Sequence, residues 1–323
     1  MNLLVIRFSA LGDVAMTVPV IKSFANQHPD INITVLTRNR FTPLFSWMPE
    51  NVKTIGVNLT QYKGVLGLYK LYKELKKEQF DCVADLHNVL RTKIIRRFFR
   101  LNGCSVSVIN KGRKEKKALI GKGTEAEPLK PMKERYWETL VKSVGSKKAY
   151  IKPTTKRNVE CQGAKEIGIA PFAAYETKMY PLDKMKTVVS MLAEKGVKVF
   201  LFGGGSQEQD ILKKWEGKGV VSMCGRSKGL KEELEIISNL NLMVCMDSGN
   251  LHLASLVGTP TISIWGATHP KAGFAPDDTV VIQKTMSCRP CSIYGNKECK
   301  YGDMRCLSSI EPEEIVGKIM ELI

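Results

Sequence analysis

The stretch Leu3-Leu4-Val5-Ile6-Arg7-Phe8-Ser9-Ala10-Leu11-Gly12-Asp13 decides the fold class of this chain. A four-residue apolar run ends in a short polar turn, after which Val14, Val18, Ile21 and Phe24 recur at helical spacing. The pattern predicts a buried strand, a tight turn and a helix. Because strands that alternate with helices pair in parallel, the stretch predicts an α/β fold.

The same alternation continues through both halves of the chain. Further apolar runs predict strands at 31–36, 52–57, 80–86, 166–171, 197–202, 220–223, 242–246 and 261–265. Helical spacing predicts helices at 66–77, 134–144, 182–195, 230–239 and 312–323, with another beginning near Glu208. Two Rossmann-like, doubly wound domains in tandem follow from this order.

The length of 323 residues exceeds what one core usually fills, so two domains are expected. The patternless stretch 145–157 is the best candidate for a linker. We therefore expect a first domain at 1–155, a second at 156–310, and a separate C-terminal helix at 311–323. The polar stretch 110–131, rich in lysine, is expected to be an exposed, mobile loop.

The net charge of +17 lies in the first half of the chain. Residues 1–160 hold 30 Lys and Arg against 13 Asp and Glu, whereas residues 161–323 hold 19 of each. Such a field favours an acidic partner, which would be nucleic acid, an anionic membrane surface or a phosphorylated substrate, although a solvated surface would look the same. The chain shows no helix-turn-helix, zinc-finger or aromatic-stacking motif, which argues against nucleic acid.

Nothing in the sequence predicts a membrane span or a signal peptide. No apolar run reaches the roughly 18 to 20 residues that a span needs. The N-terminus runs directly into the first predicted strand. A cytoplasmic protein is expected.

Ligands of open α/β sheets bind beyond the carboxyl ends of the strands, so the turns there are the candidate sites. At the first such turn, Asp13 follows Gly12 and is either placed in the crevice or caps the helix. At a second, Asp247-Ser248-Gly249 precedes a helix and has the form of a phosphate cradle, with backbone N–H groups and a hydroxyl as donors. Alternatively, Asp247 caps that helix and His252 packs in the core.

A third turn, Ala174–Pro181, contains Thr177 and Lys178. These two side chains would grip a diphosphate, with the lysine stabilising the charge on a leaving group. The alternative is a solvated surface lysine. The sequence contains neither a Gly-x-Gly-x-x-Gly motif nor a P-loop lysine, so dehydrogenase and kinase functions lose support.

Four of the nine cysteines cluster near the C-terminus. Cys288, Cys291, Cys299 and Cys306 follow the pattern C-x2-C-x7-C-x6-C, which suits a structural zinc ion or an iron–sulfur cluster. Two disulfides or four free thiols are the alternatives. The dispersed cysteines are interpreted as small core residues; they are Cys82, Cys104, Cys161, Cys224 and Cys245.

Taken together, five segments in order resemble glycosyltransferase family 9 of bacterial heptosyltransferases. Arg7–Val14 is similar to the opening motif of the family, and Met246–Ala254 is similar to its donor motif. The other three segments are Asp85–Thr92, Thr177–Pro181 and Trp265–Pro270. The resemblance implies a GT-B fold in which the first domain binds the acceptor and the second the nucleotide sugar, across a cleft. It also implies that the terminal helix crosses back to the first domain.

The resemblance implies inverting transfer, without a catalytic cofactor or metal, from ADP-L-glycero-D-manno-heptose to the Kdo-linked core of lipopolysaccharide, a lipid-linked anionic glycan. Asp13 matches the general base of the family. The implied donor-binding residues are Thr177, Lys178, Glu208, Lys228, Asp247, Ser248, Gly249 and His252. The implied acceptor-binding residues are Gly12, Arg91, Lys93, Arg96 and Arg97, and a basic first half would hold the protein at the inner leaflet, peripheral to the inner membrane.

The sequence departs from the family pattern in two places. Heptosyltransferases usually carry Asp-Thr-Gly where this chain has Asp247-Ser248-Gly249, and many lack the four cysteines. These departures leave open another nucleotide sugar and a different surface glycan. A further alternative is an inactive nucleotide-sugar-binding protein, against which the presence of Asp13 and Lys178 argues.

Overall fold

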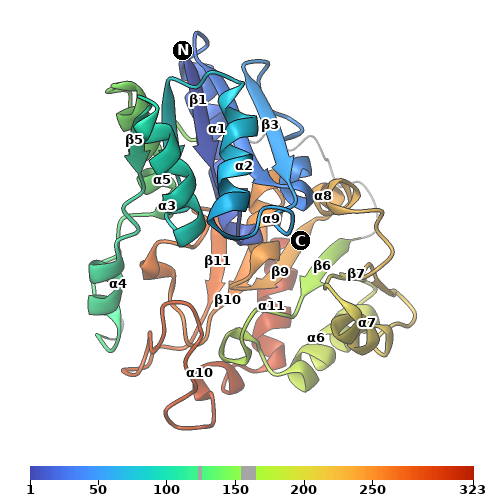
Figure 1. Ribbon diagram of the computed structural model, residues 1–323. Coiled ribbons are helices and arrows are strands. Elements are labelled where there is room, and N and C mark those ends of the chain that lie inside the picture. The colour runs from blue at the N-terminus through green and yellow to red at the C-terminus, as the bar shows by residue number, and fades with distance from the viewer. Residues whose placement is uncertain (123–125, 154–164) are drawn as a thin grey trace. The chain divides into compact units, whose positions relative to one another are not determined.

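The computed structural model describes residues 1–122, 126–153 and 165–323, which form two compact units (Figure 1). Unit 1 comprises Met1–Lys111 and Pro131–Thr154, and unit 2 comprises Gly112–Lys130 and Thr155–Ile323. Each unit contains a parallel sheet with helices, which confirms the α/β prediction. The expected domain boundary at 155–156 lies outside the described residues, as does Cys161.

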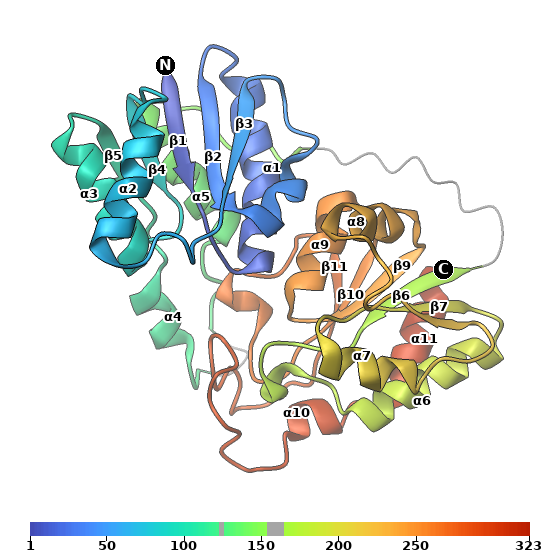
Figure 2. The same ribbon diagram turned by 45° about the vertical axis from the view of Figure 1, so that its right-hand side comes forward.

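Unit 1 contains a five-stranded parallel sheet with the order β3-β2-β1-β4-β5. The strands are β1 (Asn2–Ile6), β2 (Asn32–Arg38), β3 (Val52–Val57), β4 (Cys82–Asp85) and β5 (Ser105–Val108). The helices are α1 (Leu11–Gln27), α2 (Gly64–Lys76), α3 (Leu90–Leu101) and α5 (Met132–Val144), with the 3₁₀ helix η1 (Asn39–Phe45). Helix α1 packs with α5 and α2 with α3, on opposite faces of the sheet (Figure 2).

The core of unit 1 explains its sequence patterns. Strand β1 lies at the centre of the sheet, and its Leu3–Ile6 run is fully buried, as expected for a strand covered on both faces. In α2, Leu68, Leu71, Tyr72 and Leu75 form one apolar face. The Tyr72 ring meets the Phe99 ring of α3 edge-on, with centroids 5.0 Å apart.

Unit 2 contains a six-stranded parallel sheet with the order β11-β10-β9-β6-β7-β8. The strands are β6 (Glu166–Ala170), β7 (Lys198–Leu201), β8 (Val220–Ser222), β9 (Leu242–Met246), β10 (Thr261–Ile264) and β11 (Thr279–Ile282). The helices are α4 (Arg113–Leu119), α6 (Leu182–Glu194), α7 (Ser206–Lys213), α8 (Leu230–Asn239), α9 (Gly249–Val257), α10 (Arg305–Ser308) and α11 (Pro312–Leu322), with η3 (Glu176–Lys178) and η4 (Pro270–Ala272).

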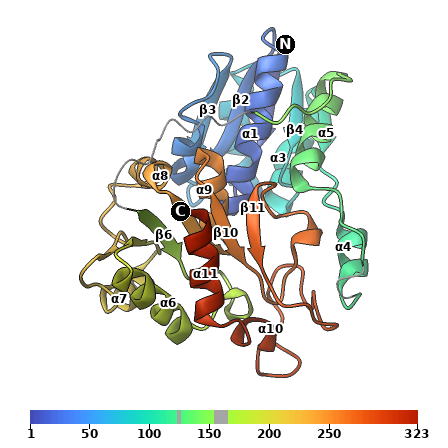
Figure 3. The same cartoon turned by 180° about the vertical axis from the view of Figure 1, so that it is seen from behind.

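The terminal helix α11 belongs to unit 2 and packs against α6 (Figure 3). Its Ile315 and Ile319 are fully buried in the core of unit 2, and Val316 is nearly so. This apolar face holds the helix on the second unit. The crossing of this helix back to the first domain stays a prediction.

The stretch 110–131 was expected to be a loop, but its residues 113–119 form helix α4 of unit 2. Leu119 packs in a small cluster with Ala272 and Ile293. The buried Lys116 places its ammonium 4.0 Å from the centroid of the Phe274 ring. A helix of two turns is too short to show periodicity, and these tertiary contacts stabilise it.

Within the described parts of the chain, no helix combines the length and the apolar character required to cross a membrane.

Substitution of Gly168 in the central strand β6 tests the packing of unit 2. A Cβ atom there would lie 2.7 Å from Leu240 Cδ1 and closer still to the Met243 sulfur. Gly168→Ala should therefore lower the free energy of unfolding by about 1–3 kcal/mol, measured by urea denaturation. The control is Gly317→Ala on the exposed side of α11, where the added Cβ meets nothing within 4 Å and helix propensity improves. Equal stability of the two variants would contradict the packing described here.

Candidate functional site

The strand orders of the two sheets define where ligands bind. The chain reverses direction across the sheet between β1 and β4 in unit 1, and between β6 and β9 in unit 2. Such switch points open a crevice at the carboxyl ends of the strands. Asp13 follows β1, while Lys178 follows β6 and Asp247 follows β9. Sheet topology thus places the predicted residues at two switch points, one in each unit.

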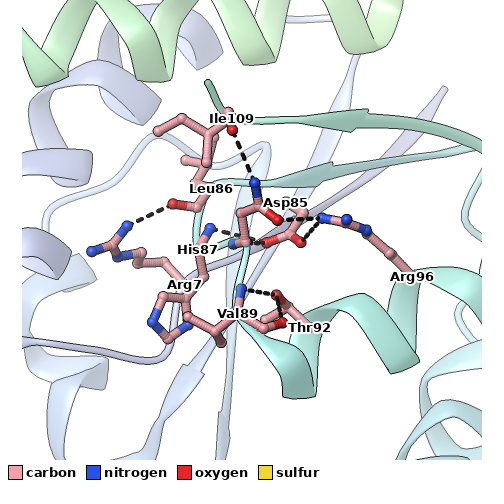
Figure 4. A network of polar contacts seen from close by, with 9 residues as sticks. Arg7, Asp85, Leu86, His87, Val89, Thr92, Arg96 and Ile109 are labelled. Atoms are coloured by element: carbon pink, nitrogen blue, oxygen red, sulfur yellow. Dashed lines mark hydrogen bonds and ion pairs between the residues drawn. The ribbon is translucent and has the colours of Figure 1, made fainter. Parts of the chain in front are cut away.

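Arg7 connects the two strands that border the switch point of unit 1 (Figure 4). Its side chain is buried, and Nη1 donates to the Leu86 carbonyl after β4 at 2.6 Å. Nη2 lies 2.6 Å from Asp13 Oδ2. Burial opposes the charge of this guanidinium, but Tyr136 and Asp13 outweigh it and raise the pKa of Arg7 above its ordinary value. Arg7 therefore remains a fixed cation that orients Asp13.

Asp13 lies in the first turn of α1, where it has two structural partners and one free oxygen. Its Oδ2 atom accepts from Arg7 and, at 3.3 Å, from the Ala10 N–H. Of the residues that the structure describes, none bonds Oδ1, and the side chain is 31% exposed. Asp13 thus stabilises the start of the helix and also presents a carboxylate oxygen that can accept a proton.

The loop after β4 is built on the fully buried Asp85 (Figure 4). Its Oδ1 accepts from the backbone N–H groups of His87 at 2.9 Å and Asn88 at 2.8 Å. Its Oδ2 pairs with Arg96 Nη1 at 2.6 Å. Arg96, which the family resemblance assigns to the acceptor, therefore neutralises a buried carboxylate and holds this loop.

His87 is a buried residue of the same loop to which the sequence analysis gave no role. Its Nε2 lies 3.3 Å from Ser9 Oγ, and its Nδ1 is buried without a hydrogen-bond partner among the described residues. Burial, together with the charge of Arg7, lowers the pKa of His87 to about 3. The imidazole is consequently neutral at physiological pH, beside the turn that carries Asp13.

The other residues implied for the acceptor lie in unit 1. Gly12 is buried in the first turn of α1, and Arg91, Lys93 and Arg97 are exposed on α3. Arg91 in addition lines a cavity of unit 1 that includes Arg38. Their positions leave acceptor binding by these residues a prediction.

In unit 2, Lys178, Asp247 and Thr268 meet at the carboxyl ends of three adjacent strands. Lys178 Nζ lies 2.9 Å from Asp247 Oδ2, and Thr268 Oγ1 donates to the same oxygen at 2.8 Å. The Lys178 and Asp247 side chains are only 13% and 11% exposed, so water screens the pair weakly. Thr177 supports the turn, since its hydroxyl donates to the Gly295 carbonyl at 2.5 Å.

Two further donors in unit 2 lack protein partners. Ser248 precedes the first residue of α9, and its buried hydroxyl has no hydrogen-bond partner within the described structure. His269 Nδ1 accepts from the Lys271 N–H at 3.1 Å, which places the proton of the neutral ring on Nε2. That Nε2 is also buried and unpartnered. Burial, with the charges of Arg289 and Lys271, lowers the pKa of His269 to about 4, so the ring stays neutral.

These groups are donors of the kind that bind anions. The first-turn N–H groups of a helix have no intrahelical acceptor, so the N-terminus of α9 offers donors together with a positive dipole end. Lys178 adds a cation whose charge Asp247 balances, and Ser248 and His269 add neutral donors. Lys178 and Ser248 could be predicted from the sequence, whereas Thr268 and His269 could not, because the pairing of β10 with β9 brings the turn after β10 to this place.

The remaining residues implied for the donor lie farther along the sheet or within α9. Glu208 follows β7, and its carboxylate accepts from the Gly204 N–H at 2.7 Å, which closes the glycine turn. Lys228 follows β8, and its backbone N–H donates to the Glu232 carboxylate while its side chain is exposed. His252 is buried in α9. Contacts of these three residues with a nucleotide remain predictions.

The cysteine segment is organised around the fully buried Arg289. Its guanidinium donates to the Gly266 carbonyl at 2.5 Å and to the Thr268 carbonyl at 2.9 Å, so the segment braces the turn after β10. Burial raises the pKa of the Cys306 thiol to about 11.

The eight described cysteines are free thiols, and in the described ranges no three His, Cys, Asp or Glu side chains gather as a metal site. The predicted zinc or iron–sulfur site is not confirmed, and we derive no catalytic step through a metal. Elemental analysis of protein purified without added metal tests this site, because zinc or iron would indicate a metal site and the absence of both would leave thiols or disulfides.

Two doubly wound units with polar residues at their switch points are the architecture of the GT-B fold of glycosyltransferases. A family model described as glycosyltransferase family 9 (heptosyltransferase) matches residues 68–302. The chain belongs to glycosyltransferase family 9.

Relatives and solved structures match over the whole length. Lipooligosaccharide heptosyltransferase 2 of Haemophilus influenzae is 26% identical, with 100% of this chain and 99% of the relative covered. The structure of E. coli ADP-heptose LPS heptosyltransferase II aligns with a TM-score of 0.73 at 19% identity, covering 100% of this chain and 98% of the other. E. coli heptosyltransferase WaaC with ADP aligns with a TM-score of 0.71 at 18% identity, covering all of both chains.

The neutral His87 predicts a dependence of stability on pH. Between its ordinary pKa of 6.5 and the folded value of about 3, the unfolded chain binds a proton that the folded chain does not. The stabilisation is therefore fully present above pH 6.5 and is lost as the pH falls toward 3. Urea denaturation at pH 7 and pH 4.5 should show a smaller acid-induced loss of unfolding free energy in His87→Gln than in the parent. Equal losses in both proteins would contradict the burial of a neutral imidazole.

Proposed function

We propose that the protein transfers a heptose or a closely related sugar from an ADP-sugar to the inner core of lipopolysaccharide, with inversion and with Asp13 as general base. The observation that carries the proposal is the Asp13 carboxylate, which Arg7 orients at the switch point of unit 1 while Oδ1 stays free. The names of the relatives, which are lipopolysaccharide and lipooligosaccharide heptosyltransferases, support the acceptor class.

Unit 2 is proposed to bind the ADP-sugar. The diphosphate would be held by Lys178, by the first-turn N–H groups of α9 and by the donors of Ser248 and His269. Asp247 and Thr268 orient the lysine, so its ammonium need not reorganise during the reaction. Negative charge grows on the diphosphate as its bond to the sugar breaks, and these donors stabilise that charge.

The proposed chemical step occurs on the opposite face of the sugar. The acceptor hydroxyl attacks the anomeric carbon, its proton moves to Asp13 Oδ1, and the diphosphate leaves with the electrons of the broken bond. Attack opposite the leaving group inverts the anomeric centre. The hydroxyl becomes acidic as its oxygen bonds to the anomeric carbon, so its proton moves to Asp13 late in the step.

Unit 1 is proposed to bind the acceptor close to an anionic surface. It carries 22 Lys and Arg against 9 Asp and Glu within its residue ranges. Such a field attracts phosphorylated glycans and acidic headgroups. A location on the cytoplasmic side, peripheral to the inner membrane, fits this charge and a lipid-linked acceptor.

Replacing the base tests the mechanism. Asp13→Asn should reduce kcat at least about 100-fold, because general base catalysis typically contributes that much, while ADP affinity stays within about twofold. The measurements are a transfer assay with ADP-heptose and calorimetry with ADP. Asp30→Asn, at an exposed turn of the same unit, is the matched control and should behave like the parent. Retained transfer by Asp13→Asn would remove this residue from the chemical step.

Replacing the lysine tests the donor site. Lys178→Ala should weaken ADP binding by about 10- to 100-fold, because it removes a charge-assisted contact to the diphosphate. Lys186→Ala on the exposed side of α6 is the control, and thermal unfolding checks that both variants fold. An unchanged dissociation constant for ADP in Lys178→Ala would place the diphosphate elsewhere.

A further inference from the structure

Arg289 is a fully buried cation of unit 2 to which the proposed function gives no role. Its guanidinium donates to the carbonyls of Gly266 at 2.5 Å, Lys284 at 2.5 Å and Thr268 at 2.9 Å, and to the Gln283 side-chain oxygen at 3.1 Å. These acceptors are neutral, and no carboxylate pairs with Arg289 in the ranges that the structure describes. Because a charged donor makes stronger hydrogen bonds than a neutral one, this planar group holds its acceptors firmly.

The acceptors show that Arg289 does more than brace its own segment. Lys284 and Gln283 precede it by 5 and 6 residues, as in a local loop. Thr268 and Gly266 precede it by 21 and 23 residues and belong to the turn after β10. Arg289 therefore connects the cysteine segment with a turn of the candidate donor site.

The bond to Gly266 leads to the backbone that carries Lys178. The Gly266 carbonyl shares a peptide group with the Ala267 N–H, which donates to the Thr177 carbonyl at 3.1 Å. A peptide group that accepts a hydrogen bond from a cation becomes a stronger donor itself. Thr177 immediately precedes Lys178 in the chain. Through one peptide group, Arg289 thus fixes the turn from which the lysine extends.

The bond to Thr268 leads to the counterion of the same lysine. Thr268 Oγ1 donates to Asp247 Oδ2 at 2.8 Å, and Lys178 Nζ lies 2.9 Å from that oxygen. A shift of the Thr268 backbone would therefore move or release the carboxylate that holds the ammonium. One guanidinium thus fixes both the base and the tip of the Lys178 side chain.

The residues after Arg289 support the stem of this lysine. Gly295 packs so closely against Lys178 that an added Cβ atom would overlap the lysine Cγ and Cδ atoms. The Gly295 carbonyl accepts from the Thr177 hydroxyl at 2.5 Å, and its N–H donates to Ser292 Oγ at 2.9 Å. The φ angle of +78° at Gly295 lies in the left-handed region, which favours glycine. The stretch 289–295 thus supports Lys178 along its length.

We propose that Arg289 is a positioning residue of the donor site, which holds Lys178 where its ammonium meets the diphosphate and does not itself touch the nucleotide. The proposal rests on the assignment of the diphosphate to Lys178 in the proposed function. The planar shape of the guanidinium is decisive, because a lysine keeps the charge but lacks the fork that reaches the Gly266 and Thr268 oxygens together. Arg289→Lys should therefore misplace Lys178 although the net charge is unchanged.

A double-mutant cycle on the full chain tests whether Arg289 acts through Lys178. Calorimetry measures the dissociation constant of ADP for the parent, Arg289→Lys, Lys178→Ala and the double variant. Arg289→Lys should weaken ADP binding by about 10-fold in the parent, which is within the coupling expected for residues of one network. In the Lys178→Ala background it should change the affinity by less than about twofold, because the group that Arg289 positions is gone. A role in stability alone would give the same loss in both backgrounds.

Two further variants keep the test specific. Arg305→Lys makes the same exchange at an exposed residue of α10, whose guanidinium lies 2.6 Å from Asp303, and should bind ADP like the parent. Arg289→Gln removes the buried charge and takes the place of Arg289→Lys in the cycle if thermal unfolding shows that the lysine variant does not fold. Its effect on ADP binding should depend on Lys178 in the same way.

Three results would overturn the proposal. The first is an unchanged ADP affinity in the Arg289 variants, and the second is an equal loss of affinity with and without Lys178. The third is failure of both Arg289 variants to fold, because the arginine would then serve the stability of unit 2. An unchanged affinity in Lys178→Ala alone would show that the proposed donor site is wrong, and this proposal with it.

Discussion

The ion pair between Arg7 and Asp13 is the interaction on which the proposed chemistry of unit 1 depends. A buried guanidinium requires polar partners. Arg7, which follows β1, has two of them, the Leu86 carbonyl after β4 and the Asp13 carboxylate in α1. The same contact fixes the rotamer of Asp13 and leaves Oδ1 free. The contact that neutralises the buried Arg7 thus also positions the proposed base, at the point where the sheet order reverses.

Unit 2 contains a similar ion pair, in which the proposed functional group is the cation. There Lys178 is the proposed ligand of the diphosphate, and Asp247 with Thr268 holds it in place. Ser248 and His269 add buried donors that the described residues leave unsatisfied. In the proposed mechanism, an oriented base in one sheet and an oriented anion site in the other are the two components that glycosyl transfer needs.

The strand–turn–helix at Leu3–Asp13 could be predicted from the sequence, because a strand that is buried on both faces, as β1 is, requires a continuous run of apolar residues. Asp13, Lys178 and Asp247 could be identified by their places after strands. The place of Thr268 beside Asp247 and the cavity lined by Arg38 could not be predicted. Both depend on strand pairing and loop packing between segments that are distant in the sequence. Helix α4 was missed because tertiary contacts stabilise its two turns, and Arg96 proved to serve the buried Asp85.

In the proposed mechanism, the switch point of unit 2 binds the nucleotide and that of unit 1 holds the base. Hydrogen–deuterium exchange of the full chain with and without saturating ADP tests this division, because backbone protection reports which turns the nucleotide orders. We predict slower exchange at residues 176–180 and 247–252 of unit 2 and no change at residues 7–13 of unit 1. Protection of residues 7–13 with unchanged exchange in unit 2 would contradict it.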